Sequence, residues 1–126
     1  KPNTIAKSLA IGTPADGFYS LKVMKETRGS AEDVTDDEIR EAIKMLAECE
    51  GIFAETAGGV TVGVAKKLIA SGRIPAKDSA VLCITGNGLK TLDAVNGHCG
   101  QAREIKPSLR EFESLLAAQD QSLINV

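Results

Sequence analysis

The sequence has few aromatic residues and few side chains suited to metal or redox chemistry. Its 126 residues include no Trp, one Tyr, three Phe and a single His. That histidine, His98, adjoins Cys99, but no second Cys or His motif supplies the other ligands of a tetrahedral metal site. The three cysteines are odd in number and widely spaced, which is typical of free thiols in a reducing compartment. We therefore expect no metal site and no disulfide.

Long hydrophobic runs and an excess of one charge are also absent. The longest apolar stretches, such as residues 80–84, are far shorter than the roughly 20 residues that a membrane-spanning helix needs. Lys and Arg total 15 against 17 Asp and Glu, so the net charge is -2, and neither sign forms a long run. The first residues show no charged region followed by an apolar signal core. We expect a cytoplasmic protein that binds neither membranes nor nucleic acid.

The chain has enough hydrophobic residues, 43%, to close one core of ordinary size. Apolar residues at helical spacing predict helices over residues 15–28, 35–50, 60–71 and 108–116. The second helix has a capping box, because Thr35 is followed three residues later by Glu38, and the fourth has the similar pair Ser108 and Glu111. Gly58 and Gly59 are expected to form the turn that precedes the third helix.

Strands are predicted at residues 4–11, 52–54 and 80–85. The last of these is apolar on both faces, which is typical of a strand inside a parallel sheet. Alternating strands and helices favour the α/β class, here a partial three-layer parallel sheet flanked by helices. Two or three strands are few for a complete sheet, so the chain is expected to be part of something larger.

Polar and glycine residues follow the predicted strands, where ligands bind in such sheets. Thr85 ends a strand and precedes a glycine-rich turn, which is either a ligand site or merely a tight turn. Glu55 either contacts a ligand or caps the amides of the next helix. Residues 12–17 either line a cofactor or form a turn in which Asp16 caps a helix.

Two further candidates are set aside. Residues 85–91 do not match a phosphate-binding P-loop, because that pattern places Gly directly before Lys and here Leu89 precedes Lys90. Lys90 could in principle form a Schiff base, but in this polar, glycine-rich segment we expect it to be solvated. His98 lies in a flexible polar loop, where a lone histidine usually has no acid or base role.

Three segments in order carry a resemblance to a known family: IGTPADG at residues 11–17, EGIFAETAGG at 50–59 and ITGNGLK at 84–90. Together they resemble threonine synthase, a pyridoxal-phosphate (PLP) enzyme of fold type II, the tryptophan-synthase β-like class. The resemblance covers residues 2–95 and continues weakly into the last helix. It implies that residues 1–126 are the C-terminal portion of such an enzyme, with 1–95 matching its core and 96–126 forming an extension and helix.

This resemblance implies a PLP-dependent carbon-oxygen lyase that converts O-phosphohomoserine and water into threonine and phosphate. The Schiff-base lysine and the phosphate loop are then expected in an N-terminal part of the same enzyme, so no catalytic residue is assigned here and the chain alone is expected to be inactive. A homo-oligomer is also expected. The alternatives are another fold type II enzyme, such as threonine dehydratase, and a non-catalytic α/β module that binds a small ligand or a partner.

The resemblance also assigns cofactor contacts. The Thr85 hydroxyl is expected to face the pyridine nitrogen of PLP, Glu55 to lie near the ring, and Asn87 to lie in the loop beside them. The segment expected along the ring consists of Ala10, Ile11 and Gly12. The sequence departs from the family at two conformational positions, with Thr56 in place of the usual proline and Thr13 in place of a frequent asparagine.

Overall fold

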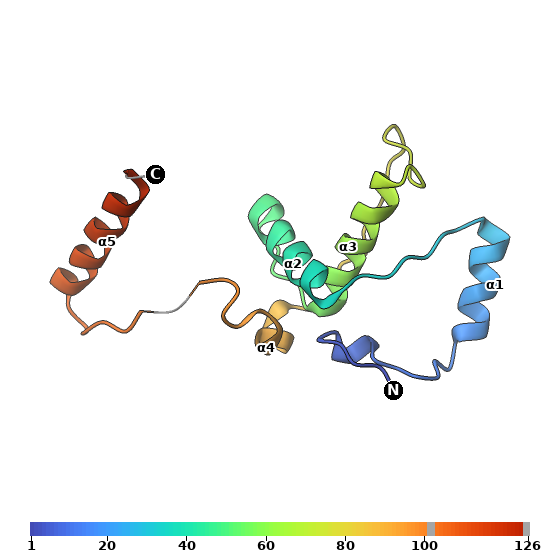
Figure 1. Cartoon of the computed structure of the whole chain (residues 1–126), viewed down its shortest axis with the longest axis horizontal. Coiled ribbons are helices and arrows are strands. Elements are labelled where there is room, and N and C mark those ends of the chain that lie inside the picture. The colour runs from blue at the N-terminus through green and yellow to red at the C-terminus, as the bar shows by residue number, and fades with distance from the viewer. Residues whose placement is uncertain (101–102, 125–126) are drawn as a thin grey trace.

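The computed structural model describes residues 1–100 and 103–124, and this part of the chain is helical (Figure 1). Two short 3₁₀ helices, η1 and η2, accompany five α-helices. In chain order the elements are η1 (Lys7–Leu9), α1 (Gly17–Thr27), α2 (Asp36–Glu50), α3 (Thr56–Ala70), η2 (Gly88–Thr91), α4 (Leu92–Val95) and α5 (Leu109–Ile124). None of the helices within these described ranges is long and apolar enough to cross a bilayer.

The start of α2 confirms the predicted capping box. The Thr35 hydroxyl accepts a hydrogen bond from the Glu38 amide at 3.3 Å, and the Glu38 carboxylate accepts one from the Thr35 amide at 2.7 Å. The helix ends at Gly51, whose φ of 68° is the left-handed conformation that favours glycine. Its predicted apolar face is buried and consists of Ile39, Ala42, Ile43 and Leu46.

The helix α3 packs side by side with α2 and begins earlier than expected (Figure 1). Gly58 and Gly59 lie inside α3, so the predicted glycine turn is wrong. A Cβ atom on Gly59 would lie 2.7 Å from Ile43 Cγ1 and 2.9 Å from the Ile39 carbonyl oxygen. Glycine is therefore required here by the close approach of the two helices rather than by a change of chain direction.

The buried residues form two clusters around this helix pair. One joins Ile39 and Ile43 of α2 to Ala6 and to Val95 of α4. The other joins α2 to α3 and to the segment before α3, and Ile84 packs against it; its members are Ala42, Leu46, Ala54 and Val62. The core therefore lies between α2, α3, α4 and the N-terminal segment.

The predicted parallel sheet is not observed in the described residues, where the strand pairing consists of an isolated antiparallel bridge between Ala54 and Asn87. Residues 80–85 form no strand, and Val81 is 90% exposed. Residues 4–11 contain η1 instead of a strand. The physical reason is that a strand needs a neighbouring strand for its backbone hydrogen bonds, and the described part of the chain supplies none beside these segments.

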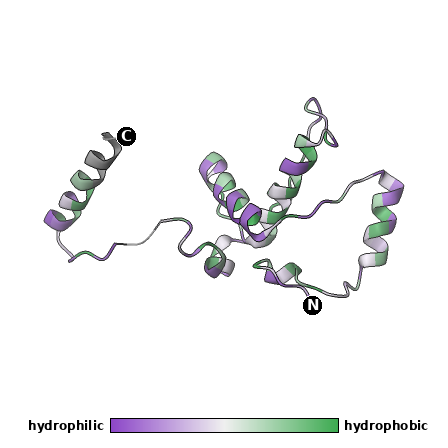
Figure 2. Cartoon of the chain, in the orientation of Figure 1, coloured by the Kyte–Doolittle hydropathy of each residue, from purple (hydrophilic) through white to green (hydrophobic). Residues whose placement is uncertain are grey.

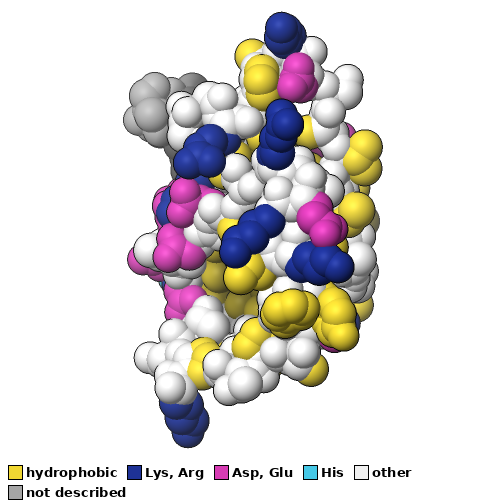
Figure 3. Space-filling view, turned by 90° about the vertical axis from the view of Figure 1, so that its right-hand side faces the viewer, with side chains coloured by type: hydrophobic (Ala, Val, Ile, Leu, Met, Phe, Trp, Pro, Cys, Tyr) yellow, Lys and Arg dark blue, Asp and Glu magenta, His cyan; other side chains and the backbone are white. Residues whose placement is uncertain are grey.

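The helices α1 and α5 confirm the predicted positions but lie apart from the core, at opposite sides of Figure 1. The helix α1 buries no residue, although it carries hydrophobic side chains (Figure 2). Phe18 is 74% exposed and packs edge to face on Tyr19. Figure 3 views the molecule from the side of α1 and shows hydrophobic side chains on that surface. In α5 the Ser108 hydroxyl accepts from the Glu111 amide, and the helix continues to Ile124, beyond the predicted end.

Candidate functional site

Two segments far apart in the sequence meet beside the N-terminus of α3. We call residues 53–56 and 86–91 together the loop junction. Its centre is the bridge between Ala54 and Asn87. The two hydrogen bonds of this bridge run from Gly88 N to the Phe53 carbonyl at 2.9 Å and from Glu55 N to the Gly86 carbonyl at 3.2 Å, and one further bond joins Thr56 N to Thr91 Oγ1 at 3.2 Å. The junction thereby fixes the turn that directly follows Thr85.

An ion pair between Glu55 and Lys90 adds to the loop junction. Both carboxylate oxygens of Glu55 lie 3.0 Å from Lys90 Nζ. The Glu55 side chain is 8% exposed, whereas that of Lys90 is 61% exposed. Glu55 is the N-cap residue of α3, but its side chain makes no capping hydrogen bond, so the capping interpretation is wrong. Lys90 is exposed as predicted, but the sequence analysis missed its pairing with Glu55.

The two glycines of the turn leave no room for larger residues. Gly86 has a φ of +78°, and a Cβ atom there would lie 1.9 Å from Glu55 Oε1. A Cβ atom on Gly88 would lie 2.5 Å from the Phe53 ring. Both positions therefore require glycine, because the backbone lies directly against side chains of the other segment. The structure thus accounts for these glycines by a tight turn.

The remaining predicted residues lie in two separate places. Thr85 is exposed and precedes the turn, so it lies next to the loop junction. Asn87 is also exposed, and its side-chain oxygen accepts a hydrogen bond from the Leu89 amide at 2.9 Å, which caps η2. Ala10 is half-buried and Ile11 is 59% exposed. Within residues 1–100, no hydrogen bond connects the segment of Ala10, Ile11 and Gly12 to the loop junction.

The segment at residues 12–17 forms a turn, in which the Gly17 amide donates to the Pro14 carbonyl. Asp16 is the N-cap residue of α1, but its side chain makes no capping hydrogen bond. The segment thus has the geometry of a turn, whereas the capping role given to Asp16 is wrong. Thr13 lies exposed in this turn.

Thr56 and Thr91 are junction residues that the sequence analysis did not identify as a pair. Thr56 is fully buried, and its hydroxyl has no hydrogen-bond partner among the described residues. It is the first residue of α3, the helix position at which proline is best tolerated. A proline could not donate the hydrogen bond to Thr91, since it has no amide hydrogen. No short sequence signal connects these threonines, which lie 35 residues apart.

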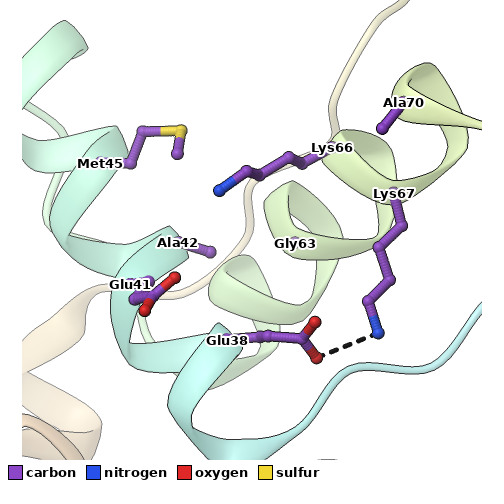
Figure 4. A pocket seen from close by; sticks show the side chains of 8 residues that line it. All are labelled: Glu38, Glu41, Ala42, Met45, Gly63, Lys66, Lys67 and Ala70. Carbon is purple, nitrogen blue, oxygen red and sulfur yellow. Dashed lines mark ion pairs between the residues drawn. The ribbon is translucent and has the colours of Figure 1, made fainter.

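A second group of charged residues lies outside the loop junction, around a cavity of about 180 Å³ between α2 and α3 (Figure 4). Lys67 Nζ lies 3.0 Å from a Glu38 carboxylate oxygen. The pKa of Glu38 is lowered mainly by the hydrogen bond from the Thr35 amide and next by the hydrogen bond from Lys67. In turn, the hydrogen bond to Glu38 raises the pKa of Lys67. These contacts connect the two helices at the surface. Across the described ranges, no group of three or more His, Cys, Asp or Glu residues could hold a metal ion.

Comparison with known proteins identifies a protein family and several similar enzymes. A family profile described as "Pyridoxal-phosphate dependent enzyme" matches residues 1–86. The threonine synthase of Halalkalibacterium halodurans is 45% identical over 91 residues, which are 71% of this chain and 25% of the relative. That of Methanocaldococcus jannaschii is 45% identical over 94 residues, 74% of this chain and 23% of the relative. The threonine synthase of Methanosarcina acetivorans is 40% identical over 109 residues, which are 86% of this chain and 27% of the relative. The chain spans about a quarter of the length of these curated relatives.

Proposed function

Because the chain belongs to the pyridoxal-phosphate dependent enzyme family, we propose that it is the C-terminal portion of a threonine synthase. The observation that carries this proposal is the match, at 45% identity, to two proteins named threonine synthase. The complete enzyme converts O-phosphohomoserine and water into threonine and phosphate. In this proposal residues 1–95 belong to the enzyme core, and residues 96–126 form the extension that contains α5.

In this proposal the loop junction lies at one edge of the PLP ring. Thr85 has an exposed hydroxyl, and the backbone after it is fixed by the hydrogen bonds at Gly86 and Gly88. A hydroxyl is a neutral partner for the pyridine nitrogen, so it can orient the ring without holding that nitrogen protonated. When bound, PLP supplies an electron sink for carbanion chemistry. The proposed role of Thr85 is therefore to orient the ring and tune its electron demand.

Five other residues are proposed as cofactor contacts, two of them in the loop junction beside Thr85. Glu55 and Asn87 belong to the same junction, so we assign them to the same edge of the ring. The exposed side-chain amide of Asn87 keeps its donors, because the hydrogen bond to Leu89 uses only the oxygen. Ala10, Ile11 and Gly12 are proposed to lie along the ring once the rest of the enzyme is present.

The proposal assigns the remaining chemistry to other parts of the enzyme. An N-terminal part would supply the lysine that binds PLP covalently and the amides that bind its phosphate. It would also supply the strands that pair with residues 80–85, whose exposed Val81 side chain would then be covered. The isolated chain is proposed to be inactive. We also propose a cytoplasmic enzyme that forms a homo-oligomer.

The test uses the full-length enzyme with PLP and O-phosphohomoserine. We expect threonine and phosphate in equal amounts, and no 2-oxobutyrate from threonine. The variant Thr85→Val should lower the rate and shift the absorption band of the bound cofactor, because the ring nitrogen loses its hydroxyl partner. The matched control Thr27→Val changes an exposed threonine of α1 whose hydroxyl bonds the Val23 carbonyl. Formation of 2-oxobutyrate from threonine, without any threonine from O-phosphohomoserine, would overturn the proposal in favour of a dehydratase.

A further inference from the structure

We propose that Lys90 is a positioning residue of the cofactor site, which acts by holding Glu55 against the turn that follows Thr85. This inference rests on the proposed function, because it assigns Lys90 a role in the site that would bind PLP. The Lys90 side chain pairs with Glu55, and the Lys90 backbone amide donates to the carbonyl of Asn87 at 3.1 Å. Its role would be to keep the carboxylate and the turn in one arrangement.

The ion pair of Lys90 differs from the other ion pairs in the described part of the chain by the burial of its carboxylate. The Glu55 side chain is 8% exposed, whereas the carboxylates of the other pairs are between 38% and 87% exposed. The pair of Lys44 and Glu48 has a lysine of nearly the same exposure, 59%, but its carboxylate is 64% exposed. Exposed pairs contribute little to stability, whereas a buried charge depends strongly on its partner.

The buried carboxylate is in direct contact with the turn. Glu55 Oε1 occupies the space beside the Gly86 α-carbon, where a Cβ atom would lie 1.9 Å away. The Glu55 amide bonds the carbonyl of the same glycine. Lys90 lies in η2, the short helix that begins at Gly88, and donates to Glu55 across the turn. Glu55 thus contacts Gly86 at the start of the segment that follows Thr85 and pairs with Lys90 near the end of that segment.

Loss of the ammonium would change this arrangement in a specific way. Without Lys90 the Glu55 carboxylate would be left buried beside Gly86 with no charge partner, which is costly. The carboxylate would then rotate towards solvent, or the turn would move away from it. Either change would displace Thr85 relative to Glu55, and with it the hydroxyl proposed to face the ring nitrogen.

The experiment compares Lys90→Met, Lys90→Arg and the matched control Lys44→Met in the full-length enzyme with PLP. The readouts are the visible circular dichroism of the bound cofactor, which reports ring orientation, and the Kd for PLP. For Lys90→Met we expect a changed visible signal and a Kd raised about tenfold, a moderate effect because the lysine itself is largely exposed. Lys90→Arg should restore the signal, since it keeps the charge, and Lys44→Met should leave both readouts unchanged.

A wild-type visible signal and Kd in Lys90→Met would overturn the inference. Should Lys90→Met not fold, the double variant Glu55→Gln with Lys90→Met removes both charges and should fold with an altered cofactor signal. A wild-type signal in the double variant, or misfolding of both variants, would show that the pair serves stability alone and would equally overturn the inference. Failure of the proposed function is distinguishable, because it would appear in the wild type as cofactor binding without threonine formation.

Discussion

The helices α1 and α2 carry similar sequence signals but have different surroundings. Both have apolar residues at helical spacing, yet α2 buries four of them and α1 buries none. The difference lies in the neighbour. The helix α3 presents Gly59 and Gly63 to α2, so the two backbones approach closely, whereas Phe18 of α1 remains exposed. An apolar face therefore predicts a helix, but only a matching surface determines whether that face is buried.

This difference agrees with a chain that spans about a quarter of its relatives' length. The part around α2 and α3 has its packing partners within residues 1–100. Apolar side chains are exposed on α1 and on residues 80–85, and exposed apolar patches of this kind are typical of surfaces that contact another part of a protein. Substitutions in the two regions should consequently change the free energy of unfolding by unequal amounts.

The largest effect is expected from Ile39→Ala. Ile39 is 1% exposed and contacts the closely packed α3, so its loss should lower the free energy of unfolding by about 2–5 kcal/mol. The matched substitution in α1, Phe18→Ala, should change it by less than about 0.5 kcal/mol, because Phe18 is 74% exposed. Urea unfolding followed by circular dichroism measures both. Equal losses would show that α1 has a packing partner in solution.

A smaller effect is expected from Gly59→Ala, which tests the approach of α2 and α3. The added methyl group would meet the Ile39 carbonyl oxygen at 2.9 Å, so overpacking should cost about 1–3 kcal/mol despite the better helix propensity of alanine. Gly63→Ala is the control, because an added Cβ there would meet the end of the Val34 side chain at 3.1 Å, and the nearest backbone atom, the Glu38 carbonyl oxygen, only at 3.8 Å. That variant should change the midpoint of unfolding little. Similar midpoints for the two variants would contradict the close approach at Gly59.

The capping box of α2 should contribute less than the helix packing. Thr35→Ala removes the hydroxyl that accepts from the Glu38 amide, and this should cost about 1 kcal/mol. Thr35→Ser keeps the acceptor and should be close to the wild type. The midpoint of thermal unfolding measures the difference. A loss in Thr35→Ser as large as that in Thr35→Ala would indicate that the methyl group, and not the cap, is responsible.

The smallest effect concerns pH and the contact between Thr4 and Asp36. The Thr4 hydroxyl donates to the Asp36 carboxylate at 2.6 Å and is the main cause that lowers the pKa of Asp36. A lowered pKa contributes stability above the unfolded aspartate pKa of about 3.9, and this contribution is lost as the pH falls through the folded pKa. Thr4→Val should therefore be less stable than the wild type at pH 6, with a difference that shrinks below pH 4. A difference independent of pH would contradict this assignment.

The sequence alone predicted the elements that depend on local interactions. The capping box between Thr35 and Glu38 spans one helical turn, so four residues suffice to predict the start of α2. Residues 80–85 could not be predicted in the same way, because a strand exists only with its neighbours. For Gly58 and Gly59 the glycine signal was interpreted as a turn. The spacing of Gly59 and Gly63, one helical turn apart, was the available sign of a closely packed helix face.

The sequence identified individual residues of the candidate site but not the contacts between them, because those contacts join distant segments. Glu55 and Thr85 were identified from their positions after predicted strands and Asn87 from the family resemblance, and the structure places Glu55 and Asn87 in one junction. The partner of Glu55 was not identified, since Lys90 lies 35 residues away and no local pattern connects the two. Pairings at such a distance depend on the folded arrangement of the chain.

The loop junction also has a consequence for the order of folding. Its contacts join segments about 35 residues apart, so closing this loop costs somewhat more chain entropy than the contacts between α2 and α3, which join residues closer in the sequence. Because local contacts form faster than distant ones, we expect the helix pair to assemble first and the junction later. Residues 86–91 are mostly exposed, so this segment can detach from the mostly buried residues 53–56 while the helix pair stays folded. The residues proposed to contact the cofactor would then be the last to reach their native positions and the first to leave them.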